Sequence, residues 1–112
     1  AAPSAGPFAE ELASLQAQFD ELERTWSELL ERQQDFTALP ARQDPLPYLE
    51  VRLAAALLAQ AVSRVELASV GGRGYFVANP TSRRVRESLF LSVQAPTEGS
   101  LRWEISQLKS RA

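Results

Sequence analysis

The sequence predicts an α+β protein, with a long N-terminal coiled-coil-like helix followed by a small helix–hairpin–helix unit. Large apolar residues recur at alternating spacings of four and three over residues 8–36, the pattern of a heptad helix. Prolines cluster over residues 40–47 and make a stiff connection. Two later segments alternate apolar and polar residues, which is typical of strands. At 112 residues the chain has room for one compact domain, expected over residues 48–112.

The heptad helix is expected over residues 8–39, after a flexible lead-in at residues 1–7. No Gly or Pro interrupts it, and Pro7 suits the first helical turn. The a positions of the repeat are Leu12, Phe19, Trp26 and Gln33. The d positions are Phe8, Leu15, Leu22, Leu29 and Phe36.

Two interpretations of this helix compete. It either pairs with another chain or packs on its own domain. A repeat of this length spans about 43 Å, whereas a compact domain of the remaining residues has a radius of gyration near ~11 Å. This mismatch favours pairing, as a homo-dimer or hetero-dimer through residues 8–36. Bulky aromatic residues at a positions leave the oligomeric state and the helix orientation open.

The second half begins with a helix over residues 48–63, whose apolar stripe includes Leu49, Leu53 and Leu57. Alanines along it allow close packing against a sheet or a neighbouring helix. Alternation then predicts strands at residues 64–70 and 84–95. The glycine-rich residues 71–74 and the Asn79-Pro80 turn separate these strands. A last helix is expected over residues 100–111, because Leu101, Ile105 and Leu108 follow at spacings of four and three.

The composition argues against most enzymes. The chain has no Cys, which excludes disulfides, zinc-thiolate sites and cysteine nucleophiles. It has no His, the commonest general base and metal ligand. We therefore expect no catalytic residue, no metal site and no cofactor. The longest apolar run, residues 53–59, is far shorter than the roughly 20 residues of a membrane span, so no spanning segment is expected.

Charge is distributed unevenly along the chain. Residues 1–50 carry ten acidic and three basic side chains, whereas residues 51–112 carry four acidic and nine basic ones. Arg83, Arg84 and Arg86 lie near aromatic residues, a combination that can bind nucleic acid. Three arginines in an acidic chain are weak evidence for such binding, so we interpret them as solvated strand positions or as charges at a sheet edge. No nucleic acid is expected as partner. Trp103 lies off the apolar face of the last helix and is a candidate for a second protein contact.

This order of elements resembles the periplasmic parts of the inner-membrane platform proteins of type II secretion and type IV pilus machines (the GspL, GspM, PilN and PilO group). Residues 8–36 match their coiled-coil segment, and residues 48–95 match one α-β-β unit of a ferredoxin-like domain. The resemblance rests on the pattern of elements, and a second strand pair is missing before Ala112. It implies a scaffold that dimerises in the periplasm, with a membrane anchor upstream of this segment and no catalytic residues.

The sequence thus predicts a non-enzymatic protein-interaction or scaffold module. The alternative is an extracytoplasmic ligand-sensing domain of a signalling receptor, in which paired helices transmit a signal and residues 71–80 line a small-molecule site. The predicted interface residues are Phe8, Leu12, Leu15, Phe19, Leu22, Trp26, Leu29, Phe36 and Trp103.

Overall fold

The structure is a computed structural model that describes residues 6–33 and 44–111. Within these ranges the chain forms four α-helices and two short 3-10 helices, and it contains no strand. The elements in order are η1 (Gly6–Phe8), α1 (Ala9–Gln33), α2 (Leu46–Val70), η3 (Gly71–Tyr75), α3 (Pro80–Phe90) and α4 (Glu98–Ser110). The predicted α+β fold, including its half ferredoxin-like unit, is therefore wrong, and the described fold is helical.

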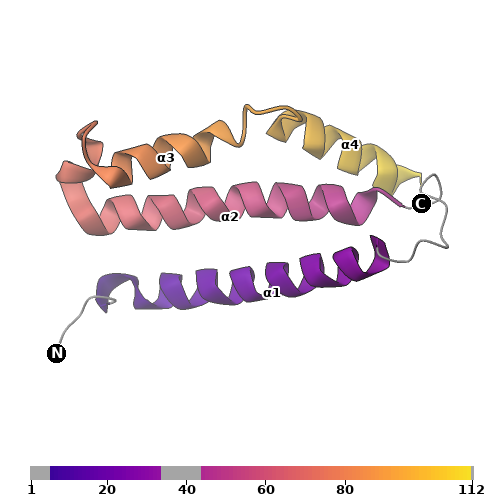
Figure 1. The fold of residues 1–112 in the computed structure, drawn as a ribbon, viewed down its shortest axis with the longest axis horizontal. Helices are drawn as coiled ribbons and strands as arrows, with labels where there is room; N and C mark the ends of the chain where they lie inside the picture. The colour runs from indigo at the N-terminus through magenta and orange to yellow at the C-terminus, as the bar shows by residue number, and fades with distance from the viewer. Residues whose placement is uncertain (1–5, 34–43, 112) are drawn as a thin grey trace.

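α2 lies in the middle of the molecule (Figure 1). α1 runs along one side of α2, while α3 and α4 follow one another along the other side. The molecule measures 53 × 30 × 26 Å and has a radius of gyration of 17.5 Å, against about 13 Å for a compact domain of this length. The molecule is therefore elongated.

The predicted strand at residues 64–70 is the last part of α2. Val65 and Leu67 do alternate with polar residues, but Val65 also follows buried Leu58 by seven residues, on the same side of a helix. A short alternation fits both periods, and the good helix formers around it favour the helix. Gly71, at φ 81°, ends α2, and its backbone N–H donates to the carbonyl of Leu67.

The predicted strand at residues 84–95 begins inside α3. The local start signal is strong, because the Asn79 side chain accepts a hydrogen bond of 2.9 Å from the Thr81 N–H and Pro80 occupies the first turn. The side of α3 that packs on α2 buries hydroxyl side chains, at Thr81, Ser82 and Ser88. A hydrophobic pattern cannot reveal such a helix, because its buried face is polar.

The predicted helices at the two ends of the chain are confirmed. The N-terminal helix is α1 together with η1, and residues 34–39 of the prediction lie outside the described residues. The last helix, α4, begins at Glu98, where the Thr97 hydroxyl accepts a hydrogen bond of 3.1 Å from the Ser100 N–H. Leu101 and Ile105 are buried as expected.

By the test of length and composition alone, residues Leu46–Tyr75 could span a membrane. They form a long apolar helix, and 17% of its apolar 18-residue segment is buried. A core helix of a soluble protein passes the same test. The absence of a spanning segment therefore stays a prediction.

Candidate interaction groove between α1 and α2

The heptad residues of α1 divide between two sides of the helix. The d-position side chains lie against α2 and are buried or half-buried: Leu15, Leu22 and Leu29. The a-position side chains remain open, with Leu12 40%, Phe19 50% and Trp26 43% exposed. The repeat therefore supplies one face for the chain's own α2 and leaves a second apolar face uncovered.

The remaining predicted interface residues are dispersed. Phe8 is half-buried at the end of η1, directly before α1. Phe36 lies outside the described residues. Trp103 is 64% exposed on α4 and does not line the hollows described below, so the structure does not bring it together with the heptad residues.

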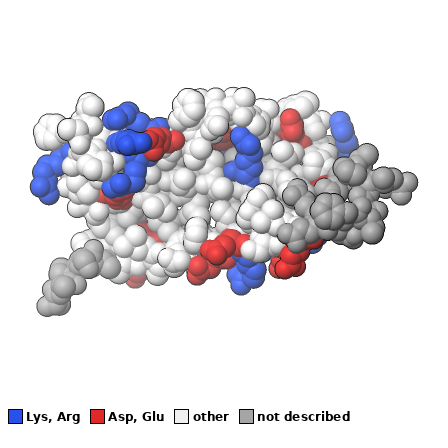
Figure 2. All heavy atoms as spheres, viewed as in Figure 1, with Lys and Arg blue, Asp and Glu red and all other residues white. Residues whose placement is uncertain are grey.

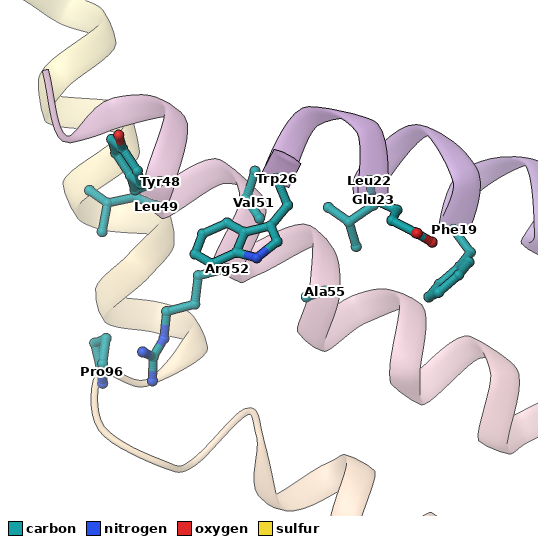
Figure 3. Close-up of a pocket in the computed structure, with 10 residues that line it drawn as sticks. All are labelled: Phe19, Leu22, Glu23, Trp26, Tyr48, Leu49, Val51, Arg52, Ala55 and Pro96. Carbon is teal, nitrogen blue, oxygen red and sulfur yellow. The ribbon is translucent and has the colours of Figure 1, made fainter. Parts of the chain in front are cut away.

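A hollow of about 700 Å³ opens between the C-terminal half of α1 and the first half of α2. Phe19 and Trp26 project from α1 toward α2 at its mouth, and the Arg52 guanidinium lies beside Pro96 (Figure 3). Its lining consists of Phe19, Leu22, Glu23, Trp26, Tyr48, Leu49, Val51, Arg52, Ala55 and Pro96. Most of these side chains are apolar, so water in the hollow finds few polar partners.

A second hollow of about 550 Å³ continues toward the N-terminus of α1. It shares Phe19, Leu22 and Ala55 with the first hollow. Together the two hollows form one depression, here called the α1/α2 groove, which follows α1 from Leu12 to Trp26. At 1.5 Å per residue, this length is about 21 Å, or four turns of helix.

Small side chains of α2 give the groove its depth. Ala55 and Ala59 lie one turn apart on this side of α2, and Val62 follows with 45% of its surface exposed. A methyl group in place of a larger side chain leaves room beside the Phe19 ring. The groove is therefore a consequence of the alanine-rich stretch in the middle of α2.

Hydrogen bonds fix the end of the groove nearest the start of α2. The Tyr48 hydroxyl donates to the Leu29 carbonyl at 3.2 Å and ties α1 to α2. The Arg52 guanidinium donates to the Ala95 carbonyl at 3.2 Å and ties α2 to the connection before α4. These bonds hold Arg52 and Pro96 in place, so this end of the groove is preformed.

The opposite side of α2 is held by polar contacts as well as by the buried Leu101 and Ile105 of α4. The Gln60 amide donates to the Ser92 hydroxyl at 2.6 Å, and Ser92 donates to Glu98 at 2.9 Å. The bonds from Ser92 and Arg102 lower the pKa of Glu98. Near the other end of α2, Arg84 and Thr81 donate to Glu66, and these bonds lower the pKa of Glu66 from 4.5 to about 2. Glu66 thus joins α2 to α3, and Glu98 joins the start of α4 to the connection before it.

The α2 side of the groove was not predicted as an interface. The sequence does carry one signal, since the run of alanines from Ala54 to Ala59 was expected to allow a close neighbour. Residues 71–80, where the alternative interpretation places a small-molecule site, line neither hollow. In the described residues, no group of three or more acidic side chains is placed to hold a metal ion.

The chain matches no family model, no curated protein and no solved structure. The resemblance to secretion and pilus platform proteins rested on an α-β-β unit over residues 48–95, and the structure places helices and turns there, with no strand.

Proposed function

We propose that the protein is a protein-interaction module that pairs with a second copy of itself through the α1/α2 groove. The observation that carries the proposal is the division of the heptad repeat. Its d-position leucines pack on α2, whereas Leu12, Phe19 and Trp26 form an exposed ridge beside a preformed apolar hollow. Contiguous apolar surface of this kind on a soluble protein marks an interaction site.

A second copy is the proposed occupant because ridge and hollow lie side by side on one surface. In a twofold-symmetric interface the same patch meets itself, so a projecting group on one protomer must find a recess on the other. Phe19 and Trp26 are the projecting groups, and the space above Ala55 and Ala59 is the recess. Aromatic anchors that fill pockets supply most of the binding energy in such interfaces.

Phe19→Glu is the sharpest test. Half of the Phe19 side chain is exposed, so the isolated protomer tolerates the change, whereas the paired state would bury a carboxylate against apolar groups. We expect wild-type protein to show twice the 12.4 kDa chain mass by light scattering, and Phe19→Glu to show the chain mass. A loss of about 3 kcal/mol corresponds to more than a hundredfold weaker pairing. Leu22 is less suitable, because it is half-buried against α2.

Ala17→Glu is the matched control, since it adds the same charge to the exposed opposite side of α1. Its mass should equal that of wild type, and circular dichroism should show equal helicity in all three proteins. Wild-type protein that stays monomeric at every protein concentration measured would overturn the hypothesis that two copies pair. So would a Phe19→Glu variant that keeps the wild-type mass.

An apolar small molecule is the second candidate for the groove. The hollow of about 700 Å³ has the size of known small-molecule sites, and Arg52 supplies a cationic group at its edge. Decanoate serves as the probe. Binding is expected to raise the melting temperature and to change Trp26 fluorescence in a Trp103→Phe background, because a ligand that binds the native state stabilises it. If neither signal changes, this candidate is rejected, and the pairing hypothesis is unaffected.

A further inference from the structure

An apolar tip projects where α2 turns into α3. It consists of three consecutive residues, Tyr75, Phe76 and Val77, which are 77%, 67% and 80% exposed. They lie at one end of the long axis of the molecule, away from the hollow lined by Trp26 and Pro96 (Figure 1). Three large neighbouring apolar side chains in water are unfavourable, so their exposure calls for a partner surface.

The backbone beneath the apolar tip is firmly held. The Phe76 N–H donates to the Arg73 carbonyl at 3.2 Å, and the Asn79 N–H donates to the Phe76 carbonyl at 2.9 Å. Gly74 is buried, and a Cβ there would lie 2.6 Å from Leu67 Cδ1. The close approach of Gly74 to α2 directs the next three side chains outward. The backbone path of the turn thus accounts for the exposure of the three side chains.

Basic side chains surround this end of the molecule. Residues 64–90 carry five arginines and two glutamates, whereas residues 6–33 carry two arginines and seven acidic residues. Figure 2 shows the resulting group of basic side chains where α2 meets α3. Arg83 and Arg84 pair with Glu87 and Glu66, yet more than half of each arginine side chain remains exposed.

We propose that the apolar tip docks on an anionic lipid bilayer surface. Aromatic side chains such as Tyr75 and Phe76 partition into the boundary between headgroups and acyl chains. Arginines around them attract negatively charged headgroups, each at an expected gain of about fivefold in affinity. A narrow convex projection suits insertion into a fluid interface, and it would fill only a small part of a protein interface. The proposal is independent of pairing through the α1/α2 groove.

Vesicle sedimentation tests the proposal with wild-type protein. We expect binding to vesicles of phosphatidylcholine mixed with phosphatidylglycerol and much weaker binding to phosphatidylcholine alone. The double variant Tyr75→Ala/Phe76→Ala should bind the anionic vesicles more than about tenfold less tightly, because most of the inserted apolar area is lost. Both side chains are exposed, so the fold should persist by circular dichroism.

Phe90→Ala is the matched control, since Phe90 is 59% exposed at the opposite end of α3. It should bind vesicles like wild type. Insertion is measured with Phe76→Trp and Phe90→Trp in a Trp26→Phe/Trp103→Phe background, where the introduced tryptophan is the only one. Only Phe76→Trp should be quenched by lipids brominated on the acyl chains. Wild-type protein that fails to bind anionic vesicles overturns the proposal, as does a double variant that binds like wild type. Equal binding to neutral vesicles overturns the choice of an anionic surface.

Discussion

The two sides of α2 are held by different chemistry. α1 packs on α2 through leucines at d positions, and its a-position side chains line an open groove. α3 packs on α2 through hydroxyl groups and a carboxylate, with Thr81 and Arg84 bonded to Glu66. Apolar contacts tolerate small changes of position, whereas hydrogen bonds require defined geometry. The α1 side is therefore suited to accept a partner helix, while the α3 side fixes the arrangement of the chain itself.

The largest losses of stability are expected from truncating the two most buried leucines, which lie on opposite sides of α2. Leu29 and Leu101 are each 2% exposed. Leu101→Ala should lower the free energy of unfolding by about 3 kcal/mol, the loss typical of a buried leucine, and Leu29→Ala by a smaller amount. Urea unfolding followed by circular dichroism measures both changes. If α1 can shift on α2 to fill the space, Leu29→Ala should lower the free energy of unfolding less than Leu101→Ala does. The reverse order would contradict the idea that the α1 side is the more adjustable of the two.

The terminal helices were predictable because their apolar residues recur at helical spacing. Leu101 and Ile105 in α4 are buried as their spacing implies. α3 was not predictable in this way, because the helix buries Ser82 and Ser88 and exposes Leu89 and Phe90. Leu89 and Phe90 therefore lie on the solvent side of the helix. The alternation of apolar and polar residues in this segment resembles that of a strand. The Asn79-Pro80 start signal was the better evidence.

The heptad repeat predicted the α1 half of the groove, and the structure shows that the d-position face of the repeat packs on α2. The length argument assumed a short domain, but α2 has 25 residues, the same as α1, and covers the leucine face along its length. Which face of the repeat is covered depends on the direction in which α2 approaches. That direction is set by contacts between residues distant in sequence, such as Tyr48 with Leu29. A spacing pattern does not contain this information.

An intermediate loss of stability is expected from replacing Glu66, which joins α2 to α3. Arg84 and then Thr81 hold the pKa of Glu66 at about 2 through hydrogen bonds, against an ordinary value of 4.5. A lowered pKa in the folded state stabilises the fold above pH 4.5, and this contribution is lost as the pH falls toward 2. Glu66→Gln should therefore lower the free energy of unfolding by about 1.5 kcal/mol at neutral pH.

The pH dependence separates this role from a simple packing effect. The stability difference between wild type and Glu66→Gln should be constant above pH 5 and should shrink between about pH 4.5 and pH 2. Urea unfolding at several pH values measures the difference. A difference that persists unchanged at the lowest pH would mean that the carboxylate charge does not hold α3 on α2.

The smallest effect is expected from the ion pair that joins α1 to α2. Arg64 pairs with Glu11, but the two side chains are 64% and 47% exposed, so water and salt screen the attraction. Glu11→Gln should lower the free energy of unfolding by about 0.5 kcal/mol or less, and the difference should vanish at high salt. Urea unfolding in low and high salt measures it. A loss as large as that of Leu29→Ala would show that charge, and not the leucine face, holds α1 in place. Polar contacts would then hold α1 as they hold α3, and the α1 side would not offer an adjustable apolar surface to a partner.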